Sequence, residues 1–430
     1  PERLREFLGA MTGLSRGAVL GIAKEIPWDR YRTFCDVGTA QGDAAVQIAR
    51  AHPHLSGVGF DLPSVGPLFE EYVEKHGLSD RLSFVPGNFF EDFKFGQEIV
   101  HATPRTVTVG DAALYTSLYG TRFAVQSSDE FAKAIGYARS PLDDLLTFHV
   151  VFGKTTPDIS LNAIANLGYA NCRFLKPAYP GDTLLSVSEV IGVKENSNGE
   201  TGTVYVRSTG RNQDGDVVLE YVRWVMVRKR DKSSPAPEAV VPELPDRVDP
   251  AELGAGVPQL DVSKYDYALA GSPYKWGDYE VGEKIDHVDG MTLEEAEHQI
   301  ATRLYQNTAK VHFNQHTEAK GRFGKRIVYG GVVISLARAL SYNGLNNAFH
   351  LAAINGGRHV SPCFAGDTVY AWSEVLEKAE LPGRTDVGAL RIRLVAVKDR
   401  DCADFPLKTD DGKYADGVLL DLDAWVLLPR

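Results

Sequence analysis

The sequence is poor in cysteine, with four residues in 430 and no Cys-x-x-Cys pair. The scattered positions (Cys35, Cys172, Cys363, Cys402) fit neither a disulfide framework nor a zinc site, so we expect no metal and a reducing, cytoplasmic setting. No run of eighteen apolar residues occurs, and PERLREFLGA lacks the layout of a signal peptide, so we expect no membrane partner. Basic residues number 46 against 57 acidic ones, a net charge of −11, which disfavours a nucleic-acid partner.

A proline-rich stretch gives the clearest division of the chain. DKSSPAPEAVVPELPDRVDP, residues 231–250, holds five prolines, and each removes a backbone donor and fixes φ. Such a stretch cannot run through the interior of a sheet. We therefore interpret 231–273 as a linker between domains.

The segments on either side of this linker resemble each other. RFLKPAYPGDTLLSVSEV (173–190) lies 185 positions before RHVSPCFAGDTVYAWSEV (358–375), and FEDFKFGQEIVH (90–101) lies 186 before WGDYEVGEKIDH (276–287). Each copy has an apolar stretch of helical spacing followed by several long strands, which indicates a duplicated α+β module at 88–230 and 274–430. We expect GDT, at 181–183 and 366–368, to be a turn motif in both copies.

Residues 1–87 match neither copy and predict an incomplete α/β, Rossmann-like βαβ unit. Asp36, Gly38 and Gly42 end a strand and open a helix, and Asp61 closes the next strand. With its context, HPHLSGVGFDLP and RLSFVPGNFF, the segment resembles the nucleotide half of class I S-adenosylmethionine-dependent O-methyltransferases over residues 1–92. The resemblance implies that the glycines approach the cofactor and that Asp61 holds its ribose. The rest of that fold does not follow, so we expect a vestigial adenosyl site.

From about Asn88 to Arg430 the sequence resembles the MaoC-like hot-dog hydratases, and within them the mesaconyl-CoA hydratase group. The resemblance rests on FFEDFKFGQEIVHATPRT, LNAIANLGYANCRFLKPAYPGDTL, RLYQNTAKVHFN, YGGVVISLARALSYNGL and FAGDTVYAWSE. It implies a double hot-dog fold with two modules paired as a pseudo-dimer. It also implies a hydro-lyase that hydrates mesaconyl-CoA, a CoA thioester, to β-methylmalyl-CoA without a cofactor.

The resemblance places the chemistry in copy two. Hydratases of this fold carry GDxNPxH, and the aligned stretch 306–312 keeps the histidine as His312 but has Asn307 in place of the aspartate. Copy one has Gln126 at the histidine position. Imidazole suits proton transfer near neutral pH, and Asn307 can orient the water or the ring. Gly330 and Gly331, at the start of the copy-two helix, are implied to bind the substrate there, with Gly331 supplying the amide for the thioester oxygen.

Basic residues supply the candidates for substrate binding. Arg322, Lys325 and Arg326 precede Gly330 and suit the phosphates of CoA. The free carboxylate of a mesaconyl group calls for a buried arginine, for which Arg303 and Arg358 are candidates.

Several alternatives remain open. If the reaction requires a carboxylate, the nearest by sequence are Asp286, Asp289 and Glu297. The chain could also be a methyltransferase through its N-terminal fragment, or a non-catalytic acyl-CoA binding protein. We expect a homo-oligomer.

Overall fold

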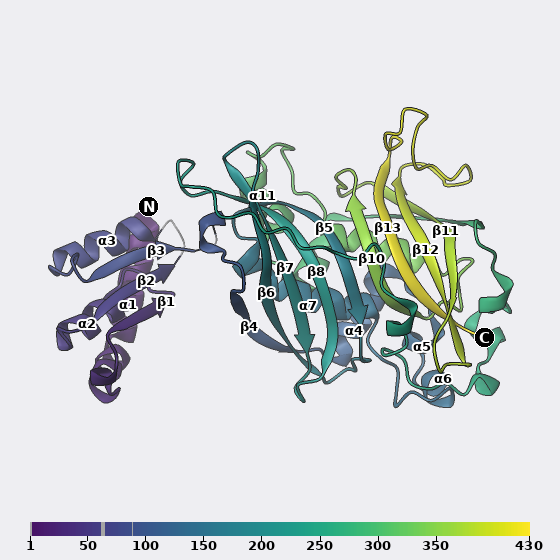
Figure 1. The fold of residues 1–430 in the computed structure, drawn as a ribbon, viewed down its shortest axis with the longest axis horizontal. Helices are drawn as coiled ribbons and strands as arrows, with labels where there is room; N and C mark the ends of the chain where they lie inside the picture. The colour runs from purple at the N-terminus through teal and green to yellow at the C-terminus, as the bar shows by residue number, and fades with distance from the viewer. Residues whose placement is uncertain (1, 62–64, 88) are drawn as a thin grey trace. The chain divides into compact units, whose positions relative to one another are not determined.

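The computed structural model describes residues 2–61, 65–87 and 89–430, and the chain divides into two compact units, residues 1–92 and 93–430 (Figure 1). The first unit is α/β. Its three strands form a parallel sheet in the order β1-β2-β3. The elements are α1 (Glu2–Glu25), β1 (Thr33–Val37), α2 (Asp43–Ala51), β2 (Ser56–Asp61), α3 (Gly66–Lys75) and β3 (Leu82–Pro86). The predicted βαβ succession is confirmed, and α1 is an addition to it.

The N-terminal unit has a small core and an open edge. Phe69, from α3, packs against α2 and approaches Gly42 so closely that an added Cβ would lie 2.6 Å from its ring. On the other side, β1 pairs with β2 alone in the described part of the chain, and Val37 is 74% exposed. Parallel sheets are normally buried on both faces. An exposed strand of this kind is expected for an α/β sheet whose remaining strands are missing.

The second unit contains the duplicated module. Copy one comprises β4 (Glu98–Thr106), α4 (Val109–Tyr119), α5 (Ala124–Ser127), α6 (Asp129–Ala134), α7 (Asp144–Ile159), β5 (Ala163–Phe174), β6 (Thr183–Glu195), β7 (Thr201–Arg211) and β8 (Val217–Arg228). Copy two comprises β9 (Lys284–Thr292), α9 (Glu295–Leu304), α10 (Lys310–Phe313), α11 (Gln315–Glu318), α12 (Gly330–Leu340), β10 (His350–His359), β11 (Thr368–Glu380), β12 (Val387–Lys398) and β13 (Val418–Pro429).

The two copies share one ten-stranded sheet, in the order β4-β6-β7-β8-β5-β10-β13-β12-β11-β9 (Figure 1). β5 and β10 join the halves as an antiparallel pair, with Ile354 opposite Cys172. The long helices α7 and α12 are almost wholly buried against the sheet. This is the double hot-dog arrangement, with the two halves continuous rather than separate.

Hydrogen bonds repeat between the copies. His101 Nε2 lies 2.8 Å from Ser188 Oγ, and His287 Nε2 lies 2.8 Å from Ser373 Oγ. Asp182 and Asp367 accept from backbone N–H groups of their own GDT loops in the same way. The GDT motif therefore forms a turn in each copy.

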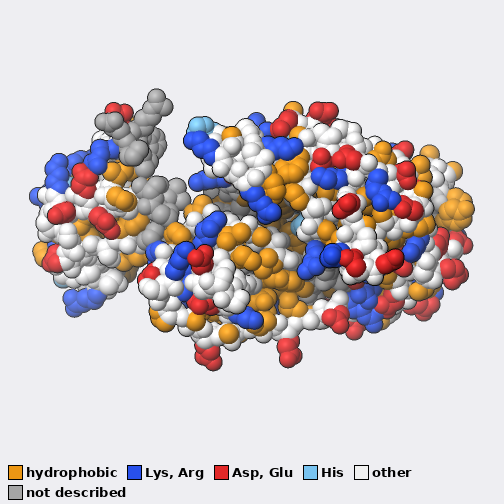
Figure 2. All heavy atoms as spheres, turned by 90° about the horizontal axis from the view of Figure 1, so that it is seen from above, with side chains coloured by type: hydrophobic (Ala, Val, Ile, Leu, Met, Phe, Trp, Pro, Cys, Tyr) orange, Lys and Arg blue, Asp and Glu red, His pale blue; other side chains and the backbone are white. Residues whose placement is uncertain are grey.

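The proline-rich connection between the two copies is packed within the second unit. Val248, Leu253, Val257, Leu260 and Tyr265 are buried in a cluster with β10 and β13 residues. None of the helices in the described part of the chain has the length and apolar character to span a bilayer. Figure 2 shows basic and acidic side chains interspersed over one face of residues 93–430.

Candidate active site

The start of α12 is crowded by aromatic rings. Tyr329 is its N-cap residue and provides no side-chain cap for the first N–H groups, which have no acceptor within a helix. A Cβ at Gly331 would lie 2.3 Å from the Tyr329 ring and 2.4 Å from that of His149. A Cβ at Gly330 would lie 2.4 Å from the His359 ring. Glycine is thus needed at both positions for close approach, and a helix start of this kind carries N–H groups that suit an anionic oxygen.

His312 lies beside this helix start on the short helix α10. Its Nδ1 is 3.0 Å from the carbonyl oxygen of Ile327. A carbonyl accepts, so Nδ1 carries the proton and Nε2 carries a lone pair. The ring is half-buried and its centre is 5.5 Å from that of Tyr329. Burial lowers the pKa of His312 to about 4, against the raising effect of the Ile327 carbonyl and together with His298 and His359, so the ring is neutral at physiological pH.

Asn307 holds the turn that leads into α10. It is buried, and its side-chain oxygen accepts a hydrogen bond from the Ala309 backbone N–H at 3.0 Å. This Asx turn fixes the chain just before His312. Copy one abuts the same loop, because a Cβ at Gly153 of α7 would lie 1.8 Å from the Tyr305 carbonyl oxygen.

Copy one also contributes His149 from α7. Its Nε2 is 2.9 Å from Ser335 Oγ, and its Nδ1 is 3.4 Å from the Tyr329 hydroxyl. Burial lowers the pKa of His149 to about 3, so this ring is neutral. The candidate site therefore lies where α7 of one copy meets the start of α12 of the other.

The three candidate carboxylates serve local structure. Asp286 accepts from the Val288 N–H, and Glu297 accepts from the Glu294 N–H in a capping box at α9. Asp289 is exposed and accepts from the Asn343 side chain.

The basic loop before α12 divides into two parts. Arg322 and Lys325 are exposed, with Arg322 over the Phe323 ring and Lys325 Nζ 4.3 Å from the centre of the Phe364 ring. Arg326 is mostly buried and ion-paired with Glu295. Arg322 and Lys325 are therefore available to phosphates, whereas the Arg326 guanidinium is engaged with α9.

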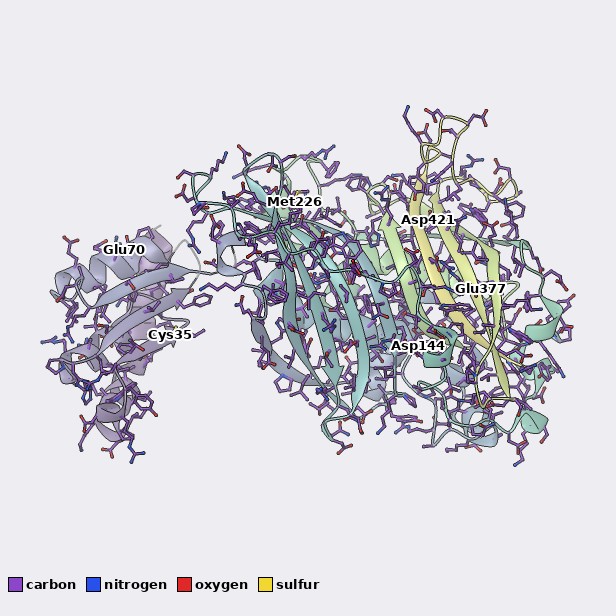
Figure 3. The ribbon with its side chains drawn as sticks, in the orientation of Figure 1. Cys35, Glu70, Asp144, Met226, Glu377 and Asp421 are labelled. Atoms are coloured by element: carbon purple, nitrogen blue, oxygen red, sulfur yellow. The ribbon has the colours of Figure 1, made fainter. Side chains whose placement is uncertain are left out.

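Arg303 and Arg358 do not share the surroundings of His312. Arg303 is an exposed residue of α9. Arg358 is exposed on β10 opposite Asp421, which Figure 3 labels on β13. Successive side chains of a strand point to opposite faces. Since His359 faces the start of α12, Arg358 faces away from it.

The matching region of copy one is different. Gln126 donates through its side chain to the Phe349 carbonyl at 2.8 Å. Asp143 and Asp144 stand at the start of α7, where copy two has Tyr329 and Gly330 (Asp144 is labelled in Figure 3). Burial beside Asp144 raises the pKa of Asp143 to about 6. An acidic helix start is unsuited to a second anionic oxygen.

Four residues at or near the site escaped the sequence analysis. These are His149, Arg223, Tyr329 and His359. The offset of the duplication could have found His149, because it places this residue opposite Ser335 of the copy-two helix.

The mesaconyl-CoA hydratase family matches residues 78–406. The β-methylmalyl-CoA dehydratase of Chloroflexus aurantiacus is 65% identical over 346 residues, covering 80% of this chain and 98% of the relative. The mesaconyl-CoA hydratase of Cereibacter sphaeroides is 60% identical over 347 residues, with the same coverage of 80% and 98%.

Two solved structures show the same fold. The structure of a MaoC domain protein dehydratase from Chloroflexus aurantiacus is 65% identical, with a TM-score of 0.78 over 80% of this chain and 98% of its own. Rv0216 of Mycobacterium tuberculosis, described as a double hot-dog fold, is 25% identical, with a TM-score of 0.59 over 80% and 99%.

The N-terminal unit has separate relatives. The O-methyltransferase domain family matches residues 4–95. The tetracenomycin 8-O-methyltransferase TcmO of Streptomyces glaucescens is 40% identical over 92 residues, which cover 21% of this chain and 27% of that enzyme. The N-terminal unit thus spans about a quarter of such an enzyme.

Proposed function

The chain belongs to the mesaconyl-CoA hydratase family, and we propose that its hydration chemistry takes place where His312 meets the start of α12. The protein is a hydro-lyase that interconverts mesaconyl-CoA and β-methylmalyl-CoA. The observation that carries the proposed site is the Nδ1 bond of His312 to Ile327, which leaves Nε2 free to accept a proton.

The reaction adds water across the double bond beside a thioester. His312 Nε2 takes a proton from water while the water oxygen bonds to the β-carbon. The π electrons move toward the thioester oxygen, and the N–H of Gly331 at the helix start stabilises the developing charge. The imidazolium then returns its proton to the α-carbon, so one H and one OH are added and His312 is regenerated.

Substrate binding follows the charges near the site. We assign the phosphates of CoA to Arg322 and Lys325, because these exposed cations precede the helix start by a few residues. Arg326 orders the loop through Glu295. Copy one shapes the acyl pocket through α7.

The N-terminal unit is dispensable in this proposal. The Asp61 carboxylate accepts a hydrogen bond from the Ala40 N–H of the glycine loop at 2.9 Å, so the local turn of a nucleotide-binding half is present. The exposed strand β1 lacks the neighbours that complete a methyltransferase. We expect S-adenosylmethionine to bind weakly or not at all. Calorimetry that finds submicromolar binding, lost in Asp61→Ala, would contradict this.

The assay that tests the proposed function compares the full chain with residues 88–430 on mesaconyl-CoA. We expect nearly equal hydration rates, since 346 residues of this chain, about the length of the fragment, cover 98% of the Chloroflexus relative. A folded full chain that does not hydrate mesaconyl-CoA would refute the function. An inactive but folded 88–430 fragment would refute the dispensability of the preceding residues.

We also propose a homo-oligomer in a reducing compartment. The four cysteines are free, which suits such a compartment. The strands β4 and β9 are the two edges of the ten-stranded sheet, and an edge strand can pair with a second copy, which is the ground for this proposal. Light scattering on the purified chain measures the oligomeric state, and a monomer at all concentrations would contradict self-association.

A further inference from the structure

Arg223 is a buried cation whose hydrogen-bond acceptors are neutral. It lies on β8 and is 1% exposed. Its guanidinium donates to Thr155 Oγ1 at 2.7 Å and to Ser160 Oγ at 3.1 Å, and it lies 4.4 Å over the Phe152 ring. Its Nε is buried without a hydrogen-bond partner. The two hydroxyls and the partial negative charge at the C-terminal end of α7 offset only part of the desolvation free energy of the buried guanidinium.

The second buried arginine in the described part of the chain shows the contrast. Arg338, on α12, has the carboxylates of Asp143 and Asp144 in its electrostatic surroundings. The groups that act on Arg223 are the phenols of Tyr169, Tyr221 and Tyr329, which are uncharged at neutral pH. A guanidinium keeps its positive charge in a protein, so an anionic ligand is the natural partner for the buried Arg223 side chain.

The position of Arg223 connects it with the proposed active site. Tyr169 pairs with Arg223 across β5 and β8, and the Tyr169 ring lies 6.0 Å from that of His359. His359 Nε2 is a second buried atom without a hydrogen-bond partner. On the other side, the Phe152 ring that carries the guanidinium lies 5.8 Å from Tyr329, the N-cap of α12. The two atoms without a hydrogen-bond partner, Arg223 Nε and His359 Nε2, thus belong to residues on either side of Tyr169, next to the start of α12.

We propose that Arg223 binds the free carboxylate of the acyl group and thereby selects dicarboxylic acyl-CoA substrates. This inference rests on the proposed function, because mesaconyl-CoA carries a carboxylate on the carbon that receives the hydroxyl. A guanidinium fork binds a carboxylate through two parallel hydrogen bonds and neutralises its charge. An enoyl group with a methyl in that place leaves the buried charge unpaired. The side chain therefore acts in specificity rather than in proton transfer.

The test compares two substrates in two variants. Tiglyl-CoA has the same carbon skeleton and double-bond geometry as mesaconyl-CoA, with a methyl in place of the carboxylate. In Arg223→Met we expect kcat/KM for mesaconyl-CoA to fall by about 30-fold or more, as for loss of one partner of a buried charged pair. The value for tiglyl-CoA should stay within about threefold or rise. Arg223→Gln, which keeps a hydrogen-bonding side chain, should show the same loss of preference.

Thermal unfolding supplies the structural readout. Without bound substrate, Arg223→Met should be as stable as the wild type or more so, because the free protein loses an unpaired buried charge. Arg338→Met, the control, should be less stable, because it leaves Asp143 without its cation. If an Arg223 variant lowers kcat/KM for both substrates by the same factor, or keeps the wild-type preference for mesaconyl-CoA, the inference is overturned. A folded wild-type enzyme without activity on mesaconyl-CoA would instead refute the proposed function.

Discussion

His149 and Ser335 occupy matching positions of the two copies, 186 residues apart, and their side chains are hydrogen-bonded to each other at 2.9 Å. Tyr119 and Tyr305 form a second such pair at 2.7 Å. In a two-fold arrangement, only residues close to the axis can contact their own counterparts. The pseudo-two-fold axis therefore runs between α7 and α12, and copy one reaches the site of copy two along it.

The Ser335 hydroxyl should contribute measurably to stability. It accepts a hydrogen bond from Tyr115, and it bonds to the buried Nε2 of His149. Ser335→Ala leaves both groups without this partner, which costs about 1–3 kcal/mol. Urea unfolding followed by tryptophan fluorescence measures the change. Ser117→Ala, on the exposed side of α4, is the control and should stay within about 0.5 kcal/mol of the wild type.

Asn307 should act as a positioning residue. Asn307→Ala removes the acceptor for the Ala309 N–H and so loosens the turn that positions His312. We expect kcat to fall about fivefold, which corresponds to ~1 kcal/mol in the activation barrier. Asn307→Asp keeps an oxygen acceptor for the Ala309 N–H and restores the acid of the wider family's motif, so it should remain active. Steady-state hydration rates decide between the roles: a larger loss in Asn307→Ala than in His312→Ala would mean that the assignments are reversed.

Gly331 should tolerate no side chain. Ala at this position would place its Cβ within 2.4 Å of the rings of Tyr329 and His149, and such overpacking costs about 1–3 kcal/mol. We expect kcat/KM to fall at least about tenfold, because the N–H that faces the thioester oxygen is displaced. Gly110 is the second residue of α4, as Gly331 is of α12, and a Cβ there meets its nearest atom at 3.5 Å. Equal activity of Gly331→Ala and Gly110→Ala would contradict the crowded helix start.

Acid should destabilise the second unit. Burial lowers the pKa of His149 to about 3 and those of His287, His312 and His359 to about 4, against 6.5 for an exposed histidine. Below pH 6.5 the unfolded chain binds protons that the folded chain does not, so this stability is present above pH 6.5 and is lost as the pH falls toward 4. Asp143, with its raised pKa, acts in the opposite sense but is a single group. Urea unfolding between pH 8 and pH 4.5 should show the decline, and a free energy of unfolding that is constant or rises on acidification would contradict it.

Much of the fold could be predicted from the sequence, because it depends on repeated local patterns. The offset of 185–186 residues identified the two copies, and the alternation of apolar residues identified strands such as β8 and β13. His312, Asn307, Gly330 and Gly331 were placed by their position in a motif, and the structure brings the His312 ring to the Tyr329 N-cap of the glycine-opened helix.

The cationic residues could not be assigned in the same way. Arg303 and Arg358 are candidates because the free carboxylate of a mesaconyl group calls for a buried arginine. Both are exposed, however, and the pleat of β10 turns Arg358 to the face opposite His359. Arg326 has a carboxylate partner on α9, 31 residues earlier. Arg223 becomes a candidate only once its neighbours are known. Because β8 packs against α7, its guanidinium donates to the hydroxyls of Thr155 and Ser160 rather than to a carboxylate.

The most direct test of the account is the rate of mesaconyl-CoA hydration by His312→Ala, with Gln126→Ala as the matched control in copy one. If His312 Nε2 moves the proton, kcat should fall by about 10²–10⁴-fold with little change in KM, because other contacts hold the acyl-CoA. Gln126 bonds to the Phe349 carbonyl, so Gln126→Ala should change the rate only slightly. If the folded His312→Ala enzyme hydrates mesaconyl-CoA within tenfold of the wild-type rate, the chemistry does not take place at the copy-two site.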